Sequence, residues 1–306
     1  MNNELTILVC SCDTYEDTWY PFFKLLKKFW QDCSYEVVLN TESKNFSYDG
    51  LNITCLQAFK DNTVPYGERL LFHLNHIKSK YILLMLDDFF IREYVNEEKI
   101  NNYIDVMNNN PDIATVTLCN SFEDDDFDDG VICDCCLRPK YCNYKMSLQC
   151  GIWNREKLIS YLRKNETPWD IERYGSIRCC RSDDKFYILK KDALLPINYG
   201  KKDGLTWGIV RGKWIYDDIV PLFKENDISI DLNERGFYDR EKCVNITSSN
   251  DKNIINGIKS LGLCEWIEYQ LFRIIRIMKK KMGFEYDEYY IAYKKRKWES
   301  KGEKNV

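Results

Sequence analysis

Two adjacent carboxylates, Asp87 and Asp88, directly follow an apolar run that begins at Tyr81 and ends at Leu86. An unbroken run of apolar residues is typical of a strand that is covered on both faces, as in a mostly parallel sheet. Two carboxylates at the end of such a strand are costly unless something offsets their charge, and a divalent cation that bridges a diphosphate does so. The alternative is that the pair caps the following turn by hydrogen bonding.

The segments around this run alternate between strand-like and helix-like patterns. The predicted strands are Leu5–Cys10, Tyr35–Leu39, Ile53–Leu56, Ile82–Leu86 and Ile113–Leu118, and the predicted helices are Asp17–Trp30, Tyr66–Ile77 and Glu97–Met107. This alternation predicts an α/β fold with an open, mostly parallel twisted sheet flanked by helices, whose ligands bind beyond the carboxyl ends of the strands. We therefore expect the loops at residues 11–15, 40–43 and 87–90 to lie at one edge.

Composition narrows the class of protein. A chain of 306 residues with 44% hydrophobic content favours a globular protein, and a net charge of -4 does not predict a nucleic-acid partner. The first apolar run, Leu5–Cys10, is too short for a signal peptide or a membrane span, so a cytoplasmic protein is expected. In that compartment the 14 cysteines are expected to be reduced.

Five short segments occur in an informative order. They are ILVCSCDTYEDTW, YGERLL, YILLMLDDFF, LQCGIWNREKL and TPWDIERYGS. With them the sequence resembles the GT-A glycosyltransferases, most closely the bacterial family 2-like enzymes that build capsule and lipopolysaccharide sugars. The resemblance runs from about residue 5 to about 215 and implies a GT-A-like domain over residues 1–225. The helical spacing and basic residues further along predict a C-terminal helical, basic extension over residues 226–306. The resemblance also implies transfer of a sugar from a UDP- or GDP-sugar to a hydroxyl of a surface glycan or a lipid-linked acceptor.

The resemblance places the donor site at the ends of the first two strands. The implied nucleotide contacts are Cys12, Asp13, Tyr15, Asn40, Thr41 and Glu42. Arg69 falls where such enzymes commonly place an arginine at the donor site, and a guanidinium pairs well with a diphosphate. A salt bridge on the helix surface is the alternative for Arg69.

The metal motif of the family is usually Asp-x-Asp, whereas Phe89 follows Asp88 in this chain. The departure leaves dependence on Mn²⁺ or Mg²⁺ open. We expect Asp88 to contact the metal or the diphosphate directly and Asp87 to position it.

In an inverting enzyme of this kind, a carboxylate general base deprotonates the acceptor hydroxyl. The resemblance favours Glu172 for this role, and Asp170 second, because the matching region in relatives lies beside the acceptor. For both, the alternative is an acid at a helix N-terminus, where the helix dipole favours negative charge.

Two further groups complete the expected site. Gln149, Trp153 and Trp169 are candidates for the acceptor platform, because sugar rings pack on aromatic faces and amides bind hydroxyls; core packing is the alternative for both tryptophans. Lys201, Arg211 and Lys213 lie in a Gly-rich segment and are expected to fold over the donor and neutralise the diphosphate, unless they are solvated loop cations.

Basic residues interrupt the apolar pattern of the predicted helix Glu265–Met282, and a second basic run spans Lys294–Lys297. This pattern predicts peripheral contact with an anionic membrane at its inner face, with packing of a solvated amphipathic helix as the alternative.

Two other function classes remain open. A nucleotidyltransferase that makes nucleotide sugars normally has a Gly-rich N-terminal phosphate loop, and residues 1–20 contain no glycine. A non-catalytic binding protein with a degenerate site would account for the incomplete Asp-x-Asp.

Overall fold

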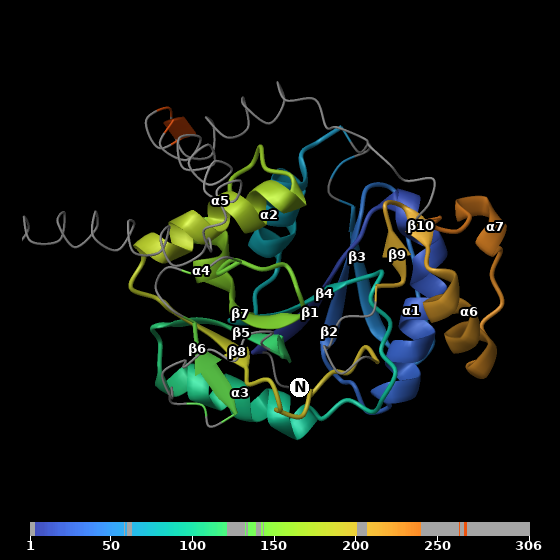
Figure 1. The fold of residues 1–306 in the computed structure, drawn as a ribbon, viewed down its shortest axis with the longest axis horizontal. Helices are drawn as coiled ribbons and strands as arrows, with labels where there is room; N and C mark the ends of the chain where they lie inside the picture. The colour runs from blue at the N-terminus through green and yellow to red at the C-terminus, as the bar shows by residue number, and fades with distance from the viewer. Residues whose placement is uncertain are drawn as a thin grey trace, which may run out of the picture.

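The computed structural model describes residues 4–57, 59, 63–120, 132, 134–138, 142, 144–200, 207–239, 263, 266 and 267. Its centre is an eight-stranded sheet in the order β3-β2-β1-β4-β7-β5-β8-β6, with helices on both faces (Figure 1). The strands are β1 Leu5–Cys10, β2 Glu36–Thr41, β3 Asn52–Gln57, β4 Tyr81–Leu86, β5 Ile113–Asn120, β6 Cys135–Leu137, β7 Gly151–Asn154 and β8 Lys185–Leu189. A separate small ribbon pairs β9 Ile209–Val210 with β10 Lys213–Trp214.

The helices connect and cover these strands. They are α1 Glu16–Phe29, α2 Tyr66–His76, α3 Glu97–Asn109, α4 Arg155–Tyr161, α5 Pro168–Arg181, α6 Tyr216–Glu225 and α7 Leu232–Arg235, preceded by the 3₁₀ turn η1 Asp13–Tyr15. The strands and helices predicted between residues 5 and 118 are confirmed, with ends that differ by a few residues. The predicted α/β fold is therefore correct.

The sheet is parallel from β3 through β4, and β7 then enters between β4 and β5 in the opposite direction. Gly151, the first residue of β7, pairs with Leu84 near the end of β4. Residues 148–150 consequently lie at the same edge of the sheet as the loop that follows β4. A site at this edge can draw on both halves of the chain.

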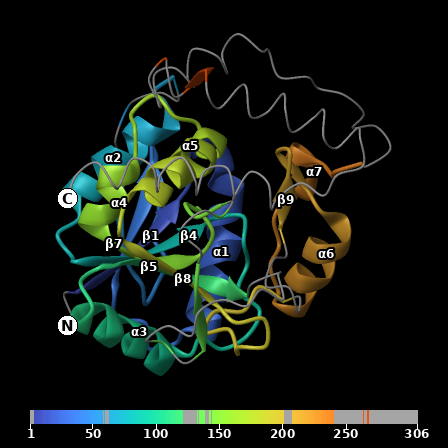
Figure 2. The same ribbon diagram turned by 60° about the vertical axis from the view of Figure 1, so that its left-hand side comes forward.

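Side-chain alternation along each strand divides the core into two layers. Ile7 and Val9 of β1 belong to the layer under α1 and α3, whereas Leu8 belongs to the layer under α2, α4 and α5. Figures 1 and 2 show the same division, with α6 and α7 beside α1. In α6, Ile219 and Phe223 are buried against the first layer.

The described start of the expected C-terminal extension, residues 226–239, lies against α1. The Lys28 ammonium donates to Asn226 Oδ1 at 2.6 Å, and the Lys24 ammonium donates to the Asp227 carbonyl at 2.6 Å. The basic helix predicted at residues 265–282 and the basic run at 294–297 fall outside the described residues, apart from positions 266 and 267. Within the described part of the chain, no helix combines the length and apolar character needed to cross a membrane.

Candidate functional site

The loops after β1 and β2 meet, as predicted, but their charged groups bind one another. The Asp13 carboxylate accepts hydrogen bonds from the Glu42 and Ser43 backbone N–H groups, both at 2.9 Å, and from the Ser43 hydroxyl at 2.6 Å. In return, the Asp13 N–H donates to Glu42 Oε2 at 2.5 Å. Partial burial acts against ionisation of Asp13, yet the hydrogen bonds from Ser43 and the loop backbone lower its pKa.

Arg69 closes this arrangement by forming an ion pair with Glu42, a residue that is only 4% exposed. The three predicted donor residues Asp13, Glu42 and Arg69 are thus brought together, and in this conformation they hold the β1 and β2 loops in place. Two neighbouring candidates differ from them. Asn40 Oδ1 and Thr41 Oγ1 are buried and have no hydrogen-bond partner among the described residues.

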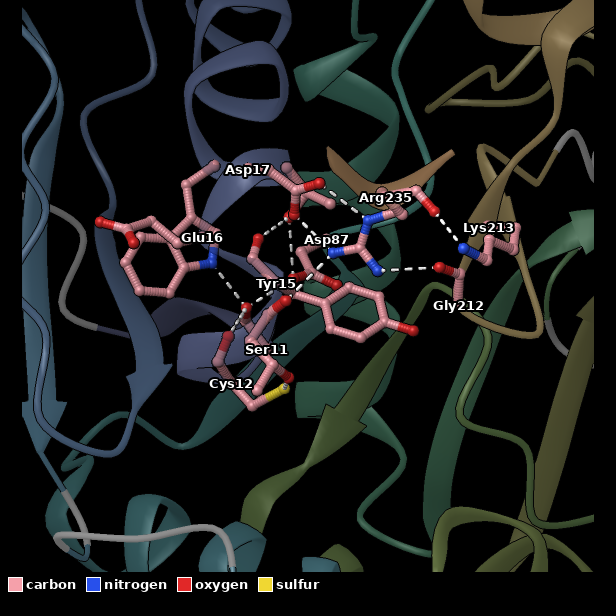
Figure 3. Close-up of polar contacts among 12 residues, drawn as sticks. Ser11, Cys12, Tyr15, Glu16, Asp17, Asp87, Gly212, Lys213 and Arg235 are labelled. Atoms are coloured by element: carbon pink, nitrogen blue, oxygen red, sulfur yellow. Dashed lines mark hydrogen bonds and ion pairs between the residues drawn. The ribbon is translucent and has the colours of Figure 1, made fainter. Parts of the chain in front are cut away.

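Asp87 is buried at the end of β4 and is held by hydroxyl groups. Its Oδ2 accepts from Ser11 Oγ at 2.5 Å and from Thr18 Oγ1 at 3.0 Å, while the Trp19 indole donates to Ser11 Oγ at 2.6 Å (Figure 3). Burial, and then the neighbouring charge of Asp88, raise the pKa of Asp87 well above its ordinary value, against the effect of the two hydroxyls. These contacts fit the positioning role expected for Asp87.

Asp88 is half-buried, and burial raises the pKa of its carboxyl from 3.8 to about 6, with its own backbone N–H and the charge of Arg235 acting in the opposite direction. Its carbonyl accepts from the Gly208 N–H at 2.8 Å. A Cβ at position 208 would lie 2.9 Å from that carbonyl oxygen and 2.4 Å from the Phe90 ring, so glycine is required for this close approach. The segment at residues 207–214 is therefore anchored directly beside Asp88.

The donor set at Asp87 and Asp88 fits a divalent cation that is shared with a phosphate ligand. Two carboxylates of raised pKa lie together, and Mg²⁺ typically uses one or two carboxylates plus substrate phosphates and water. Phe89 adds no ligand, because its side chain has no oxygen, nitrogen or sulfur atom; it is 5% exposed and packs against Tyr199 with ring centroids 5.6 Å apart. Among the described residues, no group of three or more His, Cys, Asp or Glu side chains could hold a metal on its own.

Arg235, at the end of α7, is a site residue that sequence reasoning missed. Its Nε and Nη2 donate to the two carboxylate oxygens of Asp17 at 2.8 and 2.5 Å, and its Nη1 donates to the Gly212 carbonyl at 3.3 Å (Figure 3). Its Cζ lies 4.3 Å from the ring centroid of Tyr15. Arg235 and Asp17 are 218 residues apart in the sequence, so no local pattern predicts their contact.

Two carboxylates in the first turns of α5 have different environments. Asp170 is 2% exposed and forms a capping box, in which Thr167 Oγ1 accepts from the Asp170 N–H at 3.2 Å and the Asp170 carboxylate accepts from the Thr167 N–H at 3.2 Å. Glu172 is half-buried, and its Oε1 accepts from the Leu148 N–H at 3.0 Å. Burial raises the pKa of Glu172, against the effect of hydrogen bonds from Leu148 and Ser147. The helix-cap alternative accounts for Asp170 and does not account for Glu172.

Glu172 is connected to the edge of the sheet through residues 146–150. This segment runs along α5, where the Met146 N–H donates to Ser176 Oγ at 3.0 Å and the Leu148 N–H donates to Glu172. Leu148 lies three residues before β7, whose first residue pairs beside the end of β4. Glu172 and the Asp87–Asp88 pair therefore belong to the same edge, and half-buried Gln149 lies between their elements.

The other expected site residues lie in different parts of the molecule. Trp153 is 2% exposed in β7 and packs on Phe186 with ring centroids 6.2 Å apart, so core packing accounts for it. Trp169, by contrast, is 73% exposed in the first turn of α5.

Arg211 and Lys213 are exposed near Arg235, whose carbonyl accepts from the Lys213 ammonium at 2.5 Å. Lys201 lies outside the described residues. The half-buried Cys12 thiol contacts Thr14 Oγ1 at 3.1 Å.

No family model matches the sequence, and no curated protein matches it significantly. A structure of TarS from S. aureus is similar with a TM-score of 0.39 and 13% identity over 61% of this chain and 60% of that chain. A complex of S. aureus TarS with UDP-GlcNAc has a TM-score of 0.36, with 12% identity over 76% of this chain and 69% of that one. The bifunctional IspDF from Campylobacter jejuni has a TM-score of 0.37, with 11% identity over 66% of this chain and 51% of that one.

The chain thus spans about 60% of the length of the first TarS structure. Similarity at this level does not establish an activity. What the site can do has to be judged from its own residues.

Proposed function

We propose that the chain is a glycosyltransferase that moves a sugar from a UDP- or GDP-sugar to an acceptor hydroxyl. The observation that supports this most is the pair Asp87 and Asp88, whose negative charge is buried at the carboxyl edge of parallel strands without a cation in direct contact with Asp88 among the described residues. Ligands of open α/β sheets bind at such an edge. A nucleotide diphosphate with its counter-cation is a ligand that offsets this charge.

Asp87, Asp88 and Glu172 have separate roles in the proposed reaction. Asp88 would hold the cation that accompanies the diphosphate, and Asp87, fixed by Ser11 and Thr18, keeps Asp88 in place. A bound Mg²⁺ or Mn²⁺ would supply charge stabilisation to the departing diphosphate. Glu172 accepts the proton of the acceptor hydroxyl as its oxygen bonds to the anomeric carbon, while the bond from that carbon to the phosphate oxygen breaks and its electron pair leaves with the nucleoside diphosphate. Burial raises the pKa of Glu172, which makes its carboxylate a stronger base.

The proposed acceptor is a bacterial surface glycan or a lipid-linked precursor of one. Trp169, exposed in the first turn of α5 and close in sequence to Glu172, offers an aromatic face on which a sugar ring can pack. The basic residues at 265–282 and 294–297 would suit an acceptor at an anionic membrane surface. Removing the residues after 283 should then weaken binding to anionic vesicles at low salt, and unchanged binding would refute a membrane contact of the basic run at 294–297.

A screen of nucleotide sugars tests the activity. The full chain is incubated with UDP- and GDP-sugars, with and without Mn²⁺, and release of nucleoside diphosphate is measured. We expect slow hydrolysis of one donor class, lost in Asp88→Asn and kept in Asp112→Asn, because Asp112 pairs with Lys185 at the surface. Formation of a nucleotide sugar from a nucleoside triphosphate and a sugar phosphate would identify a nucleotidyltransferase instead. Nucleotide binding without any turnover would identify a non-catalytic binding protein.

A further inference from the structure

Tyr15 and Arg235 form a stacked pair at the edge of the candidate site. Tyr15 ends the η1 turn that follows β1, and Arg235 ends α7. The guanidinium carbon lies 4.3 Å from the centroid of the Tyr15 ring, well within the range of a cation–π contact. Tyr15 is half-buried, so the guanidinium covers part of the ring and leaves part of it accessible.

The guanidinium is held firmly in this position. Asp17 binds it through two hydrogen bonds, and the side chains of Arg235 and Asp17 are only 9% and 22% exposed. The Arg235 Nη2 also donates to the Thr14 carbonyl at 3.1 Å, in the turn that carries Tyr15. A planar group fixed at several points can hold an aromatic ring in one orientation, which a flexible ammonium cannot do.

The same turn borders the carboxylates that carry the proposed chemistry. Ser11, four residues before Tyr15, donates to Asp87. Burial, followed by the charge of Asp88, raises the pKa of the Tyr15 phenol, and Arg235 acts against this shift. The Thr18 hydroxyl contacts both the Tyr15 carbonyl, at 2.6 Å, and Asp87 Oδ2, at 3.0 Å, so Tyr15 and the aspartate pair belong to the same edge of the sheet.

We propose that Arg235 is a positioning residue that acts through Tyr15, whose ring it holds as the stacking surface for the nucleobase of the donor. The identity of the ligand as a nucleoside diphosphate rests on the proposed function. A ring that is already fixed loses less conformational freedom when a base stacks on it, so the contribution of Arg235 is pre-organisation. Arg235 need not touch the ligand.

Arg235 also ties the segment at residues 207–239 to the sheet domain. The test has to distinguish this anchoring role from the positioning of Tyr15. Lys28 provides a matched control, since its ammonium ties the same segment to α1 through Asn226. Arg235→Lys keeps the charge but loses the planar fork. Asp17→Asn keeps the guanidinium but removes the charge that fixes it.

The test measures binding of UDP, GDP and inorganic diphosphate by calorimetry to the full chain and to Arg235→Lys, Asp17→Asn, Tyr15→Leu, the Tyr15→Leu/Arg235→Lys double variant and Lys28→Ala. We expect Arg235→Lys and Asp17→Asn to weaken binding of the preferred nucleotide about fivefold, as loss of a pre-organised aromatic contact would do, and to leave binding of inorganic diphosphate unchanged. In the Tyr15→Leu background, Arg235→Lys should have no further effect on nucleotide binding. Lys28→Ala should bind both ligands as the wild type does.

Three results would overturn the inference. Equal weakening of nucleotide and diphosphate binding would mean that Arg235 acts by its position near the phosphates. The same loss in Lys28→Ala would reduce Arg235 to an anchor of the segment. Independent effects of Tyr15→Leu and Arg235→Lys would show that Arg235 does not act through the ring. If the wild type binds neither nucleotide, the proposed function fails together with the inference, which distinguishes that outcome from the other three.

Discussion

Two buried clusters of charge in this molecule have opposite arrangements. Between α5 and the loop before it, Arg178 binds both carboxylate oxygens of Glu166 at 2.8 and 2.7 Å, and these side chains are 9% and 0% exposed. The Arg178 Nε also donates to the Tyr161 carbonyl at 2.7 Å. At the end of β4, two carboxyl groups of like charge, Asp87 and Asp88, lie side by side, and burial raises the pKa of both.

From this difference we infer a structural role for the first cluster and a ligand-binding role for the second. Glu166 and Arg178 satisfy each other, and the Glu166 carbonyl accepts from the Gly67 N–H at 2.9 Å, so the cluster joins α5 to α2. The aspartate pair receives hydroxyl hydrogen bonds at Asp87, and Arg235 is the cation among the described residues that offsets the charge of Asp88. A buried cluster whose opposite charges pair with each other stabilises the fold. A group of carboxylates with no directly paired cation among the described residues is suited to bind one.

Breaking the complete cluster should have the largest effect on stability. Arg178→Met leaves the Glu166 carboxylate buried without its partner, and removal of one member of a buried pair costs about 3 to 5 kcal/mol. Urea unfolding of both proteins measures the change. Lys164→Met is the control, because Lys164 pairs with Glu68 at the surface with side chains 69% and 35% exposed. If both substitutions destabilise the protein equally, the distinction between the two kinds of pair is wrong.

Glu172→Gln tests the functional edge in the same way. The amide keeps the size of the side chain and can still accept from the Leu148 N–H, but it cannot take a proton. Turnover with the preferred donor and acceptor should fall by about 100-fold or more, with donor affinity nearly unchanged, as expected for loss of a general base. In the wild type, turnover should fall as the solution is acidified through the raised pKa of Glu172. Near-normal turnover of Glu172→Gln would remove Glu172 from the mechanism.

Asp88→Asn should make the protein more stable at neutral pH. The folded-state pKa of Asp88, about 6, is above the ordinary value of 3.8, so the folded protein binds the proton more tightly than the unfolded chain. Stability from this group is fully present below the ordinary pKa and is lost as pH rises through about 6. The neutral asparagine avoids this loss, which gives a gain on the order of 1 to 3 kcal/mol at pH 7 that shrinks toward pH 4.

Unfolding without added metal or nucleotide at both pH values measures this effect. Asp112→Asn should not share the gain, because the hydrogen bond from Lys185 lowers the pKa of Asp112. An equal stability of Asp88→Asn and wild type at pH 7 would contradict the assignment of an unoffset charge to this position.

The parts of this site that sequence could predict are those set by local pattern. The apolar run before Asp87 predicts β4 because hydrophobic periodicity follows directly from secondary structure, and the topology of parallel strands then brings Asp13 near Glu42. The partners of these groups could not be predicted. The Asp13 carboxylate accepts hydrogen bonds from the loop that follows β2. Arg235 contacts Asp17 because the chain folds back through α6 and α7. Such contacts depend on packing over long sequence separations, which composition and spacing do not encode.

Asp170 allows a smaller test within a single helix. The resemblance made Asp170 the second candidate for the general base, with an acid at a helix N-terminus as the alternative. The capping box at Thr167 accounts for its placement. Asp170→Ala should therefore lower the free energy of unfolding by about 1 kcal/mol and leave turnover per folded molecule unchanged. Thr167→Ala should have a similar effect, and the double variant should lose less than the sum of the two because both remove one reciprocal contact. Turnover that falls in Asp170→Ala as it does in Glu172→Gln would contradict the structural role of Asp170. A carboxylate whose hydrogen bonds are satisfied within the fold would then also be catalytic, and the contrast between the two charge clusters would lose its basis.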